Sequence, residues 1–209
     1  MSRILFVLFV CASLQSFAFL SGKGDFENTT FFNIGYAFPS KSRLNIYNPS
    51  NLQTLSGEIE LGGVWHIRLL PITKYARLGF TGDFLTLGCN YYTFNEAGKS
   101  DKSTVITGRW GLNFGPNLSI ECFQDGYTDI YFKGRGTVVY DNVKTSLMDD
   151  DGLGFGFKYS FGMNFRWKAL YIGAEAIYGT IKKVNYSNAN QNFAVPDDYV
   201  KIKLGVNLN

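Results

Sequence analysis

The sequence predicts an all-β fold: a closed, antiparallel, up-and-down transmembrane β-barrel of eight strands. Apolar residues recur at every second position in several long segments, as they do in strands that expose one face to an apolar medium. The connections between these segments alternate between long and short, as in barrels that cross a membrane. The composition agrees: aromatic residues make up 17% of the chain, and 23 of its 209 residues are glycine.

The clearest strand covers residues 153–166, LGFGFKYSFGMNFR. One face is large and apolar, with Leu153, Phe155, Phe157, Tyr159, Phe161, Met163 and Phe165. The residues between them are small or polar. A transmembrane strand needs roughly 9–11 residues, with apolar side chains outward and polar ones inward. This stretch therefore predicts a strand that spans a membrane.

The same alternation predicts seven further strands. They are expected at residues 30–38, 57–69, 74–94, 103–114, 118–132, 169–181 and 199–208. Short turns are expected around Pro71, at Gly115-Pro116-Asn117 and at Trp167-Lys168, and long polar loops at residues 39–56, 95–102, 133–151 and 182–198. Gln124-Asp125-Gly126 breaks the pattern and predicts a bend. The apolar parity flips after Phe84, which predicts a β-bulge near the rim of the barrel.

The N-terminus has the features of a secretory signal peptide at residues 1–18. A basic start at Arg3 precedes a short apolar run, and cleavage is expected after Ala18. Residues 19–209 then form one barrel domain. The formal net charge of +3 is too small to suggest nucleic-acid binding. Cys89 and Cys122 match no zinc pattern and are expected to be free thiols.

Aromatic residues are expected to mark the two rims of the barrel. Trp65, Trp110 and Trp167 are predicted to lie together at the rim that carries the short turns. The opposite rim is expected to carry tyrosines, namely Tyr36, Tyr91, Tyr92, Tyr131, Tyr178 and Tyr199. Aromatic girdles at both interfaces are typical of membrane barrels.

Together these features resemble the eight-stranded outer-membrane barrels of Gram-negative bacteria, the OmpA and OmpX type. In the last strand, Lys203, Gly205 and Leu208 match the first three places of that family's assembly signal, and its final aromatic would stand one residue beyond Asn209. The resemblance implies a monomer in the bacterial outer membrane, with membrane lipid and the barrel-assembly machinery as partners.

Charged residues alternate with the apolar ones and are predicted to form a charge network inside the barrel. They are Glu58, Glu60, Arg77, Asp83, Arg109, Glu121, Lys158, Arg166, Glu175, Lys201 and Lys203. An eight-stranded barrel is just wide enough for side chains to fill, and buried charges must be paired. The turn positions predict the pairs Lys158–Glu175 and Arg109–Glu121. Lys201 and Lys203 are expected to reach towards Glu58 and Glu60.

These observations predict a barrel with a plugged polar lumen and a structural or surface-interaction role. An extracellular protein or a host surface would be contacted through the loops at residues 39–56, 133–151 and 182–198. Three alternatives remain: a narrow porin-like channel for small solutes, a lipid-modifying barrel enzyme, and a soluble barrel of the lipocalin type with its apolar face inward.

The sequence offers little support for catalysis or for a bound cofactor. His66 is the only histidine, and no serine stands where it could act as an activated nucleophile beside this base. Asp149-Asp150-Asp151-Gly152 could hold a cation, but it lacks the spaced ligands of a calcium loop and is interpreted as the solvated end of a loop. No catalytic residue, cofactor or metal is therefore expected.

Overall fold

The structure, a computed structural model, describes residues 29–39, 52–55, 57–95, 102–144, 149–185 and 193–207. Its ten strands are β1 (Thr29–Pro39), β2 (Leu52–Leu55), β3 (Glu58–Pro71), β4 (Ala76–Asn95), β5 (Lys102–Phe123), β6 (Gly126–Lys144), β7 (Asp149–Trp167), β8 (Leu170–Asn185), β9 (Phe193–Pro196) and β10 (Tyr199–Asn207). The predicted signal peptide, most of the loop at residues 39–56 and Leu208 lie outside the described residues.

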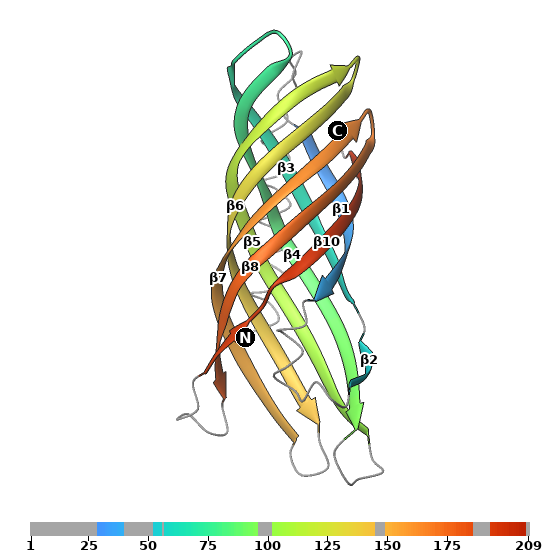
Figure 1. Ribbon diagram of the computed structural model, residues 1–209, viewed down its shortest axis with the longest axis vertical. Helices are drawn as coiled ribbons and strands as arrows, with labels where there is room; N and C mark the ends of the chain where they lie inside the picture. Colours follow the sequence, from blue (N-terminus) through green and yellow to red (C-terminus); the bar gives the residue numbers. More distant parts are fainter. Residues whose placement is uncertain are drawn as a thin grey trace, which may run out of the picture.

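Eight strands close into a ring. Its order is β10, β1, β3, β4, β5, β6, β7 and β8, and β8 pairs with β10 to complete it. Every pairing in the ring is antiparallel. Figure 1 shows the strands tilted about the long axis of the barrel. The sequence-based prediction of an all-β, closed, up-and-down barrel of eight strands is confirmed. The two remaining strands add to single members of the ring, β2 to β4 and β9 to β8.

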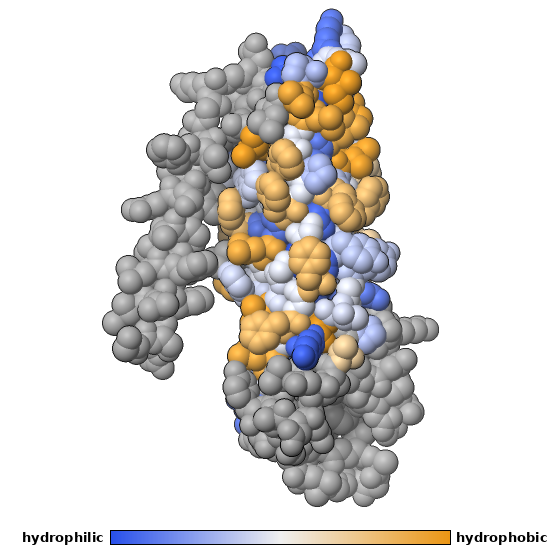
Figure 2. Space-filling model, turned by 90° about the vertical axis from the view of Figure 1, so that its left-hand side faces the viewer, coloured by the Kyte–Doolittle hydropathy of each residue, from blue (hydrophilic) through white to orange (hydrophobic). Residues whose placement is uncertain are grey.

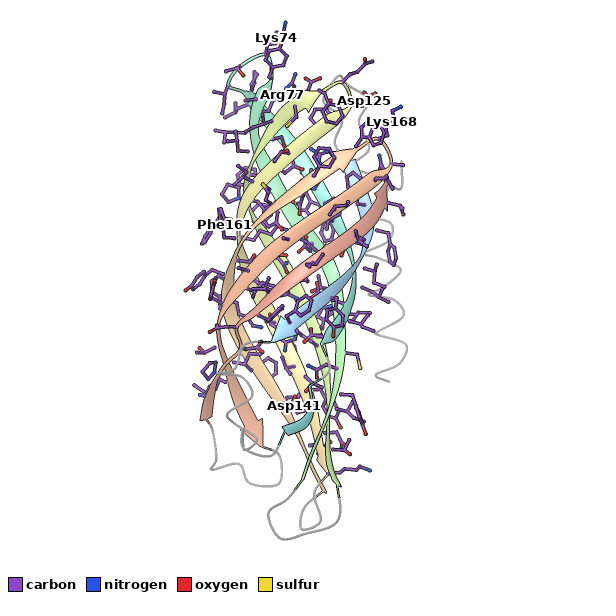
Figure 3. The ribbon with its side chains drawn as sticks, turned by 45° about the vertical axis from the view of Figure 1, so that its right-hand side comes forward. Lys74, Arg77, Asp125, Asp141, Phe161 and Lys168 are labelled. Carbon is purple, nitrogen blue, oxygen red and sulfur yellow. The ribbon has the colours of Figure 1, made fainter. Side chains whose placement is uncertain are left out.

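The two ends of the barrel differ in their connections. At one end, here called the short-turn end, tight turns join β3 to β4, β5 to β6 and β7 to β8. Asp125 and Lys168 lie in the last two turns, with φ angles of 61° and 50°. Figure 3 shows Lys74, Asp125 and Lys168 together at this end. The opposite end is called the long-loop end, because the connections from β1 to β3 and from β8 to β10 lie there; β6 and β7 are separated there by residues 145–148 alone. There β4 to β7, with 20, 22, 19 and 19 residues, extend well beyond the ends of β1 and β10.

One predicted turn is wrong. Gly115-Pro116-Asn117 lies inside β5, and the chain turns at Asp125, where the sequence predicted only a bend. Gly-Pro-Asn favours turns, but here the proline, which has no N–H to donate, lies at a break in the β5–β6 pairing. Consequently, much of the predicted loop at residues 133–151 is strand, and Asp149-Asp150-Asp151 begins β7 instead of ending a loop.

The predicted bulge is confirmed, although it lies in the middle of β4 rather than near the rim. Asp83 pairs with Asn113, and Thr86 pairs with Gly111, so β4 holds one extra residue between them. Because of this extra residue, Asp83 and Thr86 are both buried inside the barrel at 1% exposure. The bulge therefore keeps polar residues inside on both of its sides.

The outer face of the barrel is apolar and the inner face is polar. In β7, Phe157 and Phe161 are 75% and 57% exposed, whereas Lys158 between them is fully buried. Strand β10 alternates in the same way. Figure 2 shows apolar side chains spread over the outer surface of the barrel wall. The orientation predicted for the 153–166 strand is therefore the observed one.

The predicted rims need two corrections. Only Trp167 lies directly at a short turn; Trp110 lies in the middle of β5, because the turn expected after it does not exist. Trp65 lies within β3 and stacks on Phe84, with 5.4 Å between ring centroids. Two tyrosines expected at the opposite rim, Tyr131 and Tyr199, point into the barrel and are 2% exposed each.

Candidate functional site

The candidate site is the charged interior of the barrel. Among the described residues, seven basic side chains are buried there: Arg109, Lys133, Arg135, Lys158, Arg166, Lys201 and Lys203. Seven carboxylates are buried with them: Glu58, Glu60, Asp83, Asp129, Asp141, Glu175 and Asp197. The two sets balance in charge. Burying a charge without a partner is very costly, so these side chains need ion pairs or hydrogen bonds inside the barrel.

At the short-turn end, Arg166 and Asp129 form a two-pronged ion pair. The Nη2 of Arg166 donates to Oδ1 of Asp129 at 2.8 Å, and its Nε donates to the other carboxylate oxygen. Ser119 donates its hydroxyl to the same carboxylate at 2.5 Å. This paired geometry is the strongest form of arginine–carboxylate contact. Charges at this end are thus neutralised locally, between β5, β6 and β7.

In the middle of the barrel, Glu175 and Glu60 each bind two cations. Glu175 accepts from Lys203 at 2.9 Å and lies 3.4 Å from the Nζ of Lys201. Glu60 binds Arg135 at 2.9 Å and also pairs with Lys201. Lys201 therefore links the two carboxylates. It reaches Glu60 across β1, where the absence of a side chain at Gly35 leaves room: a Cβ there would lie 3.2 Å from the Cδ of Lys201.

Several of these contacts cross the lumen. Arg135 on β6 binds Glu60 on β3, and these strands are separated in the ring by β4 and β5. Lys203 on β10 donates to the hydroxyl of Tyr131 on β6 at 3.0 Å. Lys133 binds Asp83 two strands away at 2.8 Å. Bonds between strands that are not neighbours must pass through the interior, so these side chains occupy the centre of the barrel.

Nearer the long-loop end, Arg109 binds two carboxylates. Its Nε donates to Glu58 at 3.1 Å, and its Nη2 donates to Asp197 at 3.0 Å. Lys158 pairs with the same Asp197 carboxylate. Thr107 donates to Asp141 at 2.7 Å, and Figure 3 places Asp141 towards this end.

Two of the predicted ion pairs are wrong. Lys158 pairs with Asp197, while Glu175 pairs with lysines of β10. The turn at Lys168 sets Gly162, and not Ser160, opposite Glu175, which moves Lys158 out of reach. Arg109 and Glu121 both lie on β5 and so do not face each other across a turn.

Two predicted network members, Arg77 and Glu121, lie near the short-turn end and are only half-buried. The remaining nine are among the buried charges. Sequence reasoning missed Lys133, Arg135, Asp129, Asp141 and Asp197. Two of these stand in an alternation that continues through the predicted loop: Lys133, Arg135 and Thr137 are buried, while Phe132, Gly136 and Tyr140 are exposed. That continued alternation was the signal that could have revealed them.

His66 is fully buried in an aromatic setting. Its ring lies 6.2 Å from that of Phe31 and 6.4 Å from that of Tyr171. Cys89 and Cys122 are free, as the sequence predicted, and both are exposed. Within the described ranges, no group of three or more His, Cys, Asp or Glu side chains is arranged to hold a metal ion. In the same part of the chain, no helix is long and apolar enough to cross a membrane.

An apolar exterior around a charged, ion-paired interior defines the class of protein: the chain has the fold of an outer-membrane β-barrel. Among solved structures, it is similar to Ail, the attachment invasion locus protein of Yersinia pestis. The two chains are 10% identical, and the match covers 87% of this chain and 99% of that one with a TM-score of 0.49. No protein-family model matches the chain, and no curated protein matches it in sequence.

Proposed function

We propose that the protein is a monomeric barrel of the bacterial outer membrane with a closed lumen, and that it has a structural or surface-interaction role and not a catalytic one. Membrane lipid would surround its apolar face, and the barrel-assembly machinery would insert it. The observation that carries this proposal is the set of ion pairs that cross the lumen between strands that are not neighbours in the ring.

The outer surface supports the membrane location. Large apolar residues are exposed on strands all around the ring, for example Ile34 at 50% on β1, Phe114 at 54% on β5 and Leu204 at 53% on β10. In water, an apolar surface that encircles the molecule would drive association. In a membrane, the same apolar surface would contact the hydrocarbon chains of the lipids, as in other transmembrane barrels. A soluble barrel of the lipocalin type would carry these residues inside, where this barrel carries charges.

The shape of the long-loop end supports a role in surface interaction. Strands β4 to β7 are about twice as long as the roughly 9–11 residues that span a membrane. At the long-loop end they therefore extend past the ends of β1 and β10, and could hold the connecting loops away from the bilayer. Loops on a rigid scaffold are the usual place for recognition, and an extracellular protein or a host surface would be the partner.

Electrical recordings test the closed lumen. Purified protein is inserted into planar bilayers, and insertion is verified by the shift in gel mobility between boiled and unboiled samples. We expect no stable unitary conductance, because Arg135, Lys201 and Lys203 bridge the interior. Large, ion-selective conductance steps from verified barrels would refute the proposal and favour a small-solute pore.

A further inference from the structure

One buried carboxylate differs from the others in its position in the fold. Of the seven in the described part of the chain, six lie on strands of the ring, whereas Asp197 lies in the short link between β9 and β10. Asp197 is nevertheless buried, with only 3% of its surface exposed. The adjacent Asp198 is partly exposed, so the buried carboxylate lies one residue from solvent at the long-loop end of the lumen.

Backbone contacts hold this link against β8. The N–H of Asp197 donates to the carbonyl oxygen of Gly179 at 2.8 Å. The N–H of Gly179 donates to the Asp198 carboxylate at 2.9 Å. The four-residue strand β9, which precedes the link, pairs with β8. The Asp197 carboxylate is thus placed by a short segment beside the barrel wall and not by the wall itself.

The wall supplies the cations that surround this carboxylate. Arg109 donates from two nitrogens to the two oxygens of Asp197, and Lys158 pairs with one of them. The same two cations lie over the ring of Tyr199, at 5.1 and 4.9 Å from its centroid. A guanidinium that donates from two nitrogens to one carboxylate matches the geometry by which proteins recognise carboxylates, and the ammonium adds a second positive charge.

We propose that Arg109 and Lys158 form an anion-binding site for small monocarboxylates at the long-loop end of the lumen, and that the chain's own Asp197 occupies it in this structure. Without Asp197, the buried set of the described residues would hold seven cations and six carboxylates. A carboxylate from solution would restore that balance. The inference rests on the closed lumen proposed above, since in an open pore water and salt would screen these cations.

Chemical rescue tests the site. Asp197→Ala removes the carboxylate and leaves a space the size of formate. In detergent micelles, its unfolding midpoint should fall below that of the unchanged protein. Sodium formate should restore at least half of the loss and should saturate as its concentration rises. Sodium pivalate at the same concentration carries the same charge but is too large for the space, and should restore none.

Two controls make the outcome decisive. Asp197→Asn keeps the volume of the side chain but not its charge, so formate should have no effect on it. Should Asp197→Ala fail to fold, the yield of refolded barrel in formate against pivalate replaces the midpoint, with the same expectation. Equal effects of formate and pivalate, or no effect of formate in either measurement, would overturn the site.

The outcome of the formate experiment can be distinguished from the test of the closed lumen. Large conductance from the unchanged protein would refute the closed lumen whatever formate does. A closed, non-conducting protein whose Asp197→Ala variant ignores formate would refute the anion site alone.

Discussion

Placing an arginine at Phe161 should destabilise the barrel in a bilayer by about 2–4 kcal/mol. Phe161 lies within the apolar face of β7, away from both ends of the strand, and is 57% exposed. Figure 3 shows it at mid-height, pointing away from the barrel. The cost of a lipid-facing arginine is greatest at the bilayer midplane and falls to about 0–1 kcal/mol near the interfaces. We therefore expect a value in the upper part of the range.

Leu170 provides the matched control. It is also apolar and 55% exposed, but it lies beside the turn at Lys168, at the short-turn end of the barrel. Leu170→Arg should therefore cost about 0–1 kcal/mol. Phe161→Leu removes the aromatic ring without adding charge and reports the loss of apolar contact alone.

The free energy of unfolding of all three variants is measured by reversible folding into lipid vesicles across a urea series, with gel mobility reporting the folded fraction. If Phe161→Arg and Leu170→Arg cost the same, the depth dependence would be absent. The apolar face of β7 would then not be facing lipid, and the membrane orientation of the whole ring would be refuted.

Two further predictions concern the interior, and both are measured by the same folding assay. Lys203→Met or Glu175→Gln alone should destabilise the barrel by about 3–5 kcal/mol, because each leaves a fully buried charge without its partner at 2.9 Å. The double variant should lose less stability than the sum of the two single losses. If the two losses added strictly, the interaction between Lys203 and Glu175 would be refuted. Gly179→Ala should cost about 1–3 kcal/mol, because φ is +150° and a Cβ there would lie 2.9 Å from the Cγ of Lys158. Gly136→Ala, whose Cβ meets nothing within 4 Å, should stay within about 0.5 kcal/mol; a Gly179→Ala variant as stable as this control would show that the position needs no glycine.

The fold was predictable because each strand has one face towards lipid and the other towards the polar interior. Lipid outside and a polar interior impose a period of two, which is visible in residues 153–166 without any tertiary information. The predicted number of strands was still correct, because the misplaced turn at Gly115-Pro116-Asn117 and the actual turn at Asp125, where only a bend was predicted, separate the same two strands. Local turn chemistry misled the prediction, since Pro116 is tolerated where the β5–β6 ladder is already interrupted.

The pairing of the charges was less predictable, because it depends on register and on reach across the lumen. A shift of two residues at the turn around Lys168 replaces Ser160 by Gly162 opposite Glu175, and this shift alone separates Lys158 from its predicted partner. Contacts such as Arg135–Glu60 join residues 75 positions apart in sequence. No local pattern encodes such a pair, since it follows only from closure of the ring.

Closure also explains why the interior tolerates so many charges. Each cation at the centre is matched by carboxylates from other strands, so a strand that slipped by one residue would send its charges into lipid and its aromatics into the lumen. The charged interior therefore stabilises the correct register and makes the other registers unfavourable in free energy. Gly35 and Gly179 fit this role, because each gives a lysine side chain, Lys201 and Lys158 respectively, the space that its path to a carboxylate requires. The small residues at these positions therefore contribute to the correct pairing by leaving room for the charged side chains.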